Sequence, residues 1–263
     1  MRVTNLGWQS NIAVLGDGAV ATVEGENLVV RMESRPGFYW GNFLLLAKAP
    51  QASDVDRVID LFHEHFPQSE YGHTAIGWHE PSLEAAKPFL ERSFRLDHCH
   101  VSSSTSIPEP SWPCAGLAVG DTLSEADWEA TIQMALAERD PIHEAKSFER
   151  FVRKQVEVRR RQVAGGQLTW YVARLGDQVV GSMGLFVQDG IGRFQDVATH
   201  ADFRRRGVCG TLLAEVCRRG LEQLGAKTLV LLADVDGPAW RIYQAHGFEA
   251  TDELCGVWMP PKD

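Results

Sequence analysis

The sequence has no long apolar run and no excess of positive charge. None of its 263 residues fall in a stretch of about 18 consecutive apolar residues, so no membrane span is expected. The net charge is −9, and a phosphate backbone is held mainly by clustered Lys and Arg, so nucleic-acid binding is not expected either. A small anionic ligand needs only a local patch of arginines and is not excluded.

Cysteines are few, and their number is odd. The five lie far apart along the chain, at Cys99, Cys114, Cys209, Cys217 and Cys255. The opening residues MRVTNLGWQSNIAVLGDG lack the basic start and the long apolar core of a signal peptide. Together these features predict reduced thiols and a cytoplasmic location instead of a disulfide framework.

A segment rich in proline and serine divides the chain. Residues 102–120 contain three prolines among small polar residues, a composition that opposes regular structure. We therefore predict a smaller N-terminal domain at residues 1–105, a linker at 106–116 and a longer domain at 117–263.

The longer domain alternates between helical and strand patterns. Ser124 is a typical N-cap, with Asp127 three residues later, and a second helix should run from Lys146 to Val163 and stop at two glycines. The arginines Arg159–Arg161 in that helix are expected on a solvated face. We predict strands at 168–175, 178–187, 192–199, 228–233, 248 and 255–259, and helices at 210–224 and 238–246. This order is typical of an α/β fold with a mixed central sheet flanked by helices.

The segment Phe194–Leu213 is the most informative part of the sequence. A strand leads through a short turn into arginines and glycines, and a helix begins directly afterwards. The start of a helix presents unpaired N–H groups and the positive end of the helix dipole, so this arrangement favours a pyrophosphate. The segment lacks the Gly-Lys-Ser/Thr ending of a Walker A loop and the three glycines of a dinucleotide loop.

These residues resemble the GNAT superfamily of acyl-CoA-dependent N-acyltransferases. The family signature Arg/Gln-x-x-Gly-x-Gly/Ala is matched at Arg204 and Gly207, with Cys209 at the last small position. Downstream, Ala239–Phe248 matches the family pattern Ala-x-x-x-Tyr-x-x-x-Gly-Phe, while Asp236 stands where the family has Asn. The resemblance covers about residues 117–259 and implies the GNAT fold.

The N-terminal half contains a weaker version of the same order of elements. Residues 85–94 align with residues 239–248. The elements that precede 239–248 also have counterparts: residues 42–47 match a strand, 54–66 the following helix and 74–78 the next strand. The bridge Lys48–Ser53 has neither arginine nor glycine, and Phe89 replaces the tyrosine. We therefore predict a smaller α/β GNAT-like domain without a CoA site, with chance similarity as the alternative.

The resemblance also implies a reaction. Acetyl-CoA would donate its acetyl group directly to a primary amine of a small molecule or peptide in a ternary complex, without a metal. Tyr243 would act as general acid, and the backbone of Val197, Ala198 and Thr199 would pair with pantetheine and supply an oxyanion donor. The predicted cofactor-binding residues further include Arg204, Arg205, Arg206, Gly207, Val208, Cys209, Gly210, Thr211 and Asp236.

Several points stay open at this stage. Asp196 is the first choice as general base, because it is the only carboxylate on its strand, but it could equally satisfy the adjacent loop. Arg193, Gln195 and His200 are weaker choices for the acceptor cleft.

His98 and His100 share a strand face, yet no second cluster with ligand-like spacing stands out, so no metal is predicted. A catalytically inactive CoA-binding or ligand-sensing protein and a protein–protein scaffold are the alternatives, and a monomer or homodimer is expected.

Overall fold

The computed structural model describes residues 1–121, 123–141 and 144–261, which form two compact units. Unit 1 comprises Met1–Ser102, Leu232–Arg241 and the residues from Ala250 onward, and unit 2 comprises Ser103–Leu231 and Ile242–Glu249. Two segments from the C-terminal part of the sequence thus belong to the unit that begins at the N-terminus. The domain bounds expected from the sequence remain a prediction.

Unit 2 is built on a mixed sheet. Its strands lie in the order β10-β9-β8-β7-β6, and only β9 and β10 run parallel. Buried apolar runs on β7 and β8 pair through a turn in which Gly176 has a φ of 58°. The strands are β6 (Leu117–Gly120), β7 (Leu168–Leu175), β8 (Gln178–Gln188), β9 (Ile191–Thr199) and β10 (Thr228–Asp234).

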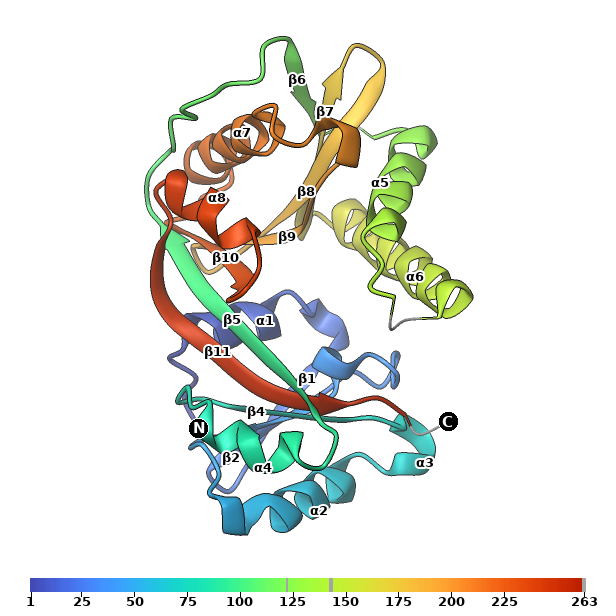
Figure 1. The fold of residues 1–263 in the computed structure, drawn as a ribbon, viewed down its shortest axis with the longest axis vertical. Coiled ribbons are helices and arrows are strands. Elements are labelled where there is room, and N and C mark those ends of the chain that lie inside the picture. Colours follow the sequence, from blue (N-terminus) through green and yellow to red (C-terminus); the bar gives the residue numbers. More distant parts are fainter. Residues whose placement is uncertain (122, 142–143, 262–263) are drawn as a thin grey trace. The chain divides into compact units, whose positions relative to one another are not determined.

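Helices cover both faces of this sheet. α7 (Val208–Glu222) lies on one face, and α5 (Glu125–Ala137) and α6 (Ala145–Ala164) lie on the other (Figure 1). Ser124 and Asp127 form the expected capping box of α5. α7 buries Leu212, Leu213 and Val216, the apolar stripe seen in the sequence. The short helix α8 (Ala239–Ala245) follows β10.

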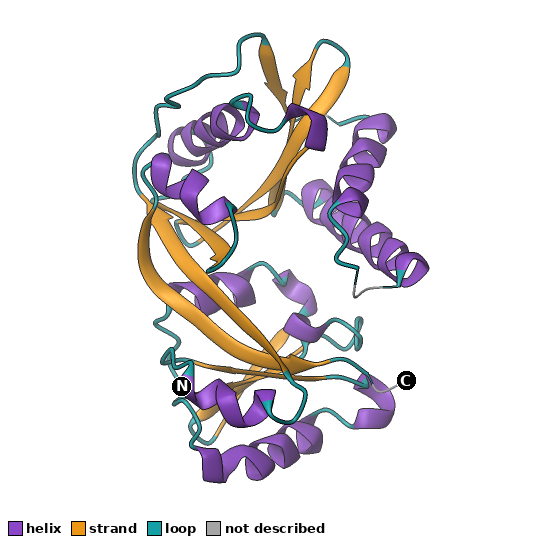
Figure 2. Ribbon diagram, in the orientation of Figure 1, coloured by secondary structure: helices purple, strands orange, loops and turns teal. Residues whose placement is uncertain are grey.

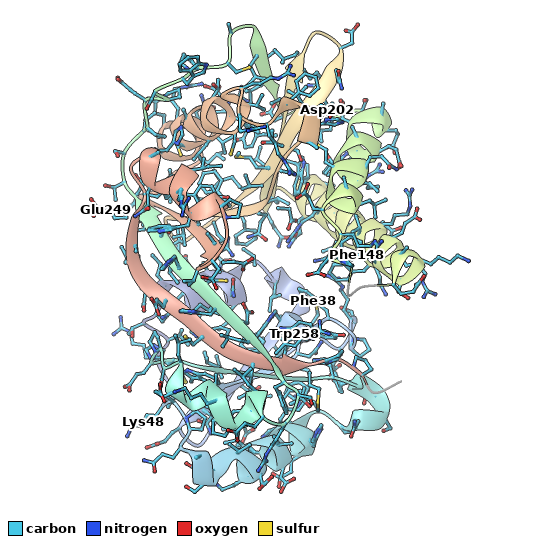
Figure 3. All side chains as sticks on the ribbon, viewed as in Figure 1. Phe38, Lys48, Phe148, Asp202, Glu249 and Trp258 are labelled. Carbon is cyan, nitrogen blue, oxygen red and sulfur yellow. The ribbon has the colours of Figure 1, made fainter. Side chains whose placement is uncertain are left out.

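Unit 1 has its own mixed sheet, in the order β1-β2-β3-β4-β11-β5. β3 and β4 run parallel, and the last strand of the chain, β11, pairs antiparallel with β4 through five residue pairs. Glu249 and Trp258 lie near the two ends of β11 (Figure 3). The elements are α1 (Leu6–Ala13), β1 (Val20–Glu24), β2 (Asn27–Arg31), β3 (Phe43–Leu46), α2 (Val55–His65), α3 (Gln68–Tyr71), β4 (Thr74–Trp78), α4 (Lys87–Leu90), β5 (Arg95–Ser104) and β11 (Glu249–Met259).

The two units repeat the same motif. In unit 1 the helix α2 connects the parallel strands β3 and β4, and in unit 2 the helix α7 connects the parallel strands β9 and β10. Figure 2 shows the strand–helix–strand succession in both units. The predicted α/β class with a mixed sheet is confirmed, and unit 1 repeats the order of strand, helix and strand that the sequence analysis predicted for a second half. Among the described residues, no helix is long and apolar enough to cross a membrane.

Some predicted boundaries were wrong. Residues 102–120 were expected to be irregular, but β5 continues to Ser104 and β6 begins at Leu117. The strand expected at 255–259 is the end of a longer strand, β11, which begins at Glu249, and the strand expected at 248 is absent because Phe248 lies just before β11. The helix expected from residue 210 begins at Val208, because Gly207 adopts a φ of 77° and serves as its N-cap.

Candidate functional site

The parallel strands β9 and β10 pair over a short distance only. Their register joins Ile191–Arg193 to Thr228–Val230 and no further, although β9 continues to Thr199. Beyond Arg193 the described residues of β9 keep their pairing with β8 on the other edge. The backbone of Val197, Ala198 and Thr199, to which the family resemblance assigns the pantetheine arm, therefore lies on a strand edge that has parted from β10.

A β-bulge lies on β9 at this place. Gly184 pairs with Gln195 and Ser182 with Ala198, so one residue of β8 faces both Asp196 and Val197. Asp196 takes up the extra length with a φ of 48°, a left-handed conformation that is unusual for a residue with a side chain. The bulge bends the strand at the point where it leaves β10.

The start of α7 provides unpaired donors. Gly207 contributes no side-chain cap, and the first turn of the helix holds no acidic residue. The first N–H groups of a helix lack intrahelical acceptors and attract anions. By contrast, the start of α2 in unit 1 follows a capping box of Gln51 and Asp54, and its first turn holds Asp56. Carboxylates thus lie at the start of α2 in unit 1, whereas the first turn of α7 in unit 2 has none.

Each of the two glycines of the loop has a packing reason. A Cβ on Gly207 would overlap the carbonyl oxygen of Trp112 and lie 3.2 Å from the nitrogen of Cys114. The Cys114 N–H donates to Thr211 Oγ at 2.8 Å, so the linker runs across the start of α7. A Cβ on Gly210 would overlap the ring of His246. The described contacts thus give both glycines a packing role, and their predicted role in cofactor binding stays a prediction.

The three arginines of the loop are exposed and differ in their surroundings. Arg204 forms an ion pair with Glu138, and Arg206 lies over the Phe203 ring, 5.1 Å from its centroid. Arg205 has a φ of 60°. Asp202 lies in the preceding 3-10 turn (Figure 3), whose first N–H groups are capped by His200. The loop thus carries three positive charges beside the donors of α7.

Tyr243 lies close to the start of α7. Burial raises the pKa of its hydroxyl well above the usual 10, and the nearby Cys209 thiol raises it further, while Arg193 lowers it. Burial also raises the pKa of Cys209 to about 11, opposed by a hydrogen bond from Thr199. The ring of Tyr243 packs 6.4 Å from Phe248, which packs 6.1 Å from Phe194 on β9. Three residues predicted separately, Thr199, Cys209 and Tyr243, therefore meet in unit 2.

Asp196 is held by a residue that the sequence analysis placed elsewhere. Its carboxylate accepts from Arg159 Nε at 3.0 Å, and Arg159 also donates to Gln195 Oε1 at 2.8 Å and to Gln162 Oε1 at 3.1 Å. The expectation that Arg159 lies on a solvated face was wrong, because its side chain is only 11% exposed. Its neighbours Arg160 and Arg161 are exposed. Its contacts with Gln195 and Asp196, far away in the sequence, distinguish Arg159 from these two neighbours.

The remaining predicted residues occupy different places. Gln195 is buried and donates to the Phe194 carbonyl, and Arg193 is half-buried and donates to the same carbonyl. Asp236 is exposed in the turn between β10 and α8, in unit 1.

Comparison with known proteins agrees with this geometry. Residues 128–248 match the family model described as the Acetyltransferase (GNAT) family. These residues form a GNAT domain. No curated protein matches the chain.

Solved structures are similar over nearly the whole chain. A functionally unknown conserved protein from Staphylococcus epidermidis has a TM-score of 0.75 at 14% identity, covering 94% of this chain and 95% of its own. A GCN5-related N-acetyltransferase from Kribbella flavida has a TM-score of 0.68 at 14% identity, and the match covers 99% of this chain and 97% of that protein. A tandem GNAT protein from the clavulanic acid biosynthesis pathway has a TM-score of 0.54 at 10% identity, and the match covers 100% of this chain and 90% of that protein. At these identities the likeness shows the fold alone, and that fold includes a second GNAT-like half.

Proposed function

We propose that the GNAT domain transfers an acetyl group from acetyl-CoA to a primary amine of a small molecule or peptide. The observation that carries the proposal is the parting of β9 from β10 directly before an uncapped helix start flanked by Arg204–Arg206. The parted edge of β9 supplies backbone groups for the pantetheine arm. The first turn of α7 and the arginines supply N–H donors and positive charge for the pyrophosphate.

The reaction is a direct displacement. The lone pair of the amine nitrogen attacks the thioester carbonyl carbon, the C–S bond breaks, and the departing thiolate takes a proton. A backbone N–H of Val197–Thr199 stabilises the oxygen that becomes negative, and one such donor is worth about 10²–10³ in rate. Tyr243 gives the proton to sulfur, because its hydroxyl, with its raised pKa, is neutral throughout the working pH range.

Asp196 is the proposed general base. A free alkylammonium holds its proton at neutral pH, so the attacking amine needs an acceptor for it. The ion pair with Arg159 keeps the carboxylate charged and fixed in the bulge, and 53% of the Asp196 side chain remains exposed to an incoming amine or a bridging water. The proton taken from the amine is then passed on to solvent.

Calorimetric titration with CoA tests the binding step. One site per chain is expected, because α2 in unit 1 has a capped, acidic start where α7 has none. Arg205→Ala should weaken binding by about tenfold, since one phosphate contact of a cation is worth roughly 1 kcal/mol or more. Arg161→Ala removes the same charge from an exposed site on α6 and should leave the affinity unchanged.

The outcomes separate this proposal from its alternatives. Binding of CoA without acetyl transfer to any amine of a broad panel favours a CoA-binding or ligand-sensing protein. No binding at all favours a scaffold and overturns the proposal.

A further inference from the structure

Three side chains from two strands of unit 1 converge outside the proposed active site. His98 lies on β5, and Glu253 and Cys255 lie on β11, which runs beside β5 (Figure 2). Glu253 and Cys255 are two residues apart and so share a strand face. His98 Nε2 and Glu253 Oε2 are 2.9 Å apart, and one donor atom from each of the three residues lies within 4.8 Å of the others. A nitrogen, an oxygen and a sulfur therefore surround one point.

The backbone around this point is fixed by bonds that do not involve the three donor atoms. The Val235 N–H donates to the His98 carbonyl at 3.3 Å, and Asn5 Nδ2 donates to the Glu253 carbonyl at 2.9 Å. Cys255 is fully buried. The side chains of His98 and Glu253 are 12% and 43% exposed. The cluster thus has a closed side at the thiol and a side open to water at the carboxylate.

The charges suit a divalent cation. A neutral imidazole, a carboxylate and a thiolate together carry two negative charges. A divalent ion bound beside the Cys255 sulfur favours the thiolate over the thiol and releases the thiol proton.

We propose that His98, Glu253 and Cys255 bind a zinc ion, with water as the fourth ligand on the Glu253 side. Imidazole, carboxylate and thiolate are the three ligand types that zinc takes in proteins, and a mixed set of this kind does not suit the oxygen-seeking Mg²⁺ or Ca²⁺. Zinc ligands bonded at 2.0–2.3 Å are separated by about 3–4 Å. Donor atoms that lie up to 4.8 Å apart therefore need to approach by about 1–2 Å. The ion would tie β5 to β11 in unit 1.

The same strand offers a matched control in His100. It lies two residues from His98 on the same face, and its ring packs 4.6 Å from that of Trp240. The described residues place no metal-binding group around it. A histidine that binds metal merely by being near the surface would behave alike at both positions.

Zinc titration of the tag-free, metal-depleted full chain tests the proposal. One ion per chain is expected, with release of about one proton, measured by calorimetry in buffers of different ionisation enthalpy. With Co²⁺ as the probe, thiolate-to-cobalt charge-transfer absorption should appear. His98→Ala and Cys255→Ser should each weaken zinc binding by more than about 100-fold and, for Cys255→Ser, remove the absorption. His100→Ala should keep both the zinc affinity and the cobalt absorption of the wild type.

Circular dichroism of the metal-free variants guards against a folding defect. If Cys255→Ser does not fold, the zinc affinity of His98→Ala and the cobalt spectrum of the wild type still test the proposal. Absence of zinc binding by the wild type overturns the proposal. An equal loss of zinc affinity in His98→Ala and His100→Ala, or a cobalt spectrum without a thiolate band, overturns it as well. None of these readouts depends on acyl transfer, so the zinc site and the proposed function fail independently.

Discussion

At the scale of single residues, burial determines the protonation state of the Tyr243 hydroxyl. The side chain is 5% exposed, and burial raises its pKa because the phenolate would lose its hydration. A raised pKa means that the hydroxyl is protonated at every pH below its usual 10 and for some distance above it. The hydroxyl therefore has a proton to offer to the sulfur whenever the C–S bond breaks. Because a CoA thiol, with a pKa of roughly 8–9 as for cysteine, is the stronger acid, this help is given while negative charge develops on the sulfur inside the site.

Replacing this residue tests the role of the hydroxyl. Tyr243→Phe should lower acetyl transfer by about 10²–10⁴-fold, the usual worth of a general acid, while CoA affinity changes little. In the wild type, no loss of activity caused by ionisation of Tyr243 should occur below pH 10. The measurement is a pH–rate profile of both proteins with one amine. Equal rates across the whole range would make Tyr243 a core aromatic residue.

Asp196 can be tested against an aspartate in the same backbone conformation. Asp189 lies in the exposed β8–β9 turn with a φ of 52°, close to the 48° of Asp196. Asparagine tolerates this conformation well, so Asp→Asn changes charge and leaves the backbone alone. Asp196→Asn should reduce the rate of acetyl transfer by about 10²-fold or more. Asp189→Asn should not, and a similar rate in both variants would contradict the assignment of the base.

At the scale of elements, the two ends of α7 contain glycines in the same left-handed conformation. Gly207 has a φ of 77° and Gly225 a φ of 75°. A Cβ on Gly225 meets nothing within 4 Å, whereas one on Gly207 overlaps the Trp112 carbonyl. Backbone strain is therefore common to the two positions, and steric overlap is confined to the first.

Alanine at each position separates the two effects. Gly225→Ala should cost about 1 kcal/mol in the free energy of unfolding, the price of a left-handed residue with a side chain. Gly207→Ala should cost more by at least about 1 kcal/mol, because the linker backbone must move. Urea unfolding measures both. Equal costs would show that Trp112 does not rest on the start of α7.

The helices and strands of unit 2 were predictable because their signals are local. The Ser124 cap, the glycines after α6 and the apolar stripe of α7 each act within a few residues. The loop Arg204–Gly210 was found in the same way, and its meeting with Tyr243 followed from the family pattern. The burial of Arg159 was not predictable, since it depends on Gln195 and Asp196, more than 35 residues away. The same holds for the contact of Trp112 and Cys114 with α7.

At the scale of the whole molecule, the order of the sequence is not the order of the packing. β11 follows the GNAT domain in the chain, yet it pairs with β4 in unit 1. Periodicity predicted a strand near residues 255–259 but carried no information about its partner, because alternation shows which face is buried and not which strand lies alongside. A division of the chain at the linker alone would leave the sheet of unit 1 without this strand.

This packing predicts that a substitution near the C-terminus weakens the unit that begins at the N-terminus. Val257 is fully buried on β11 and pairs with Ile76 on β4. Val257→Ala should cost about 2 kcal/mol, from lost apolar burial and the cavity left behind. Val172 on β7 is equally buried in unit 2, so Val172→Ala is the matched control.

Hydrogen exchange read strand by strand distinguishes the two variants. Val257→Ala should speed exchange in β3 and β4 and leave β7 and β8 protected, whereas Val172→Ala should do the reverse, because local opening follows the packing around each valine. If Val257→Ala instead loosened β7 and β8 and spared β4, β11 would belong to the sheet that precedes it in the sequence. The assignment of the last strand to unit 1 would then be wrong.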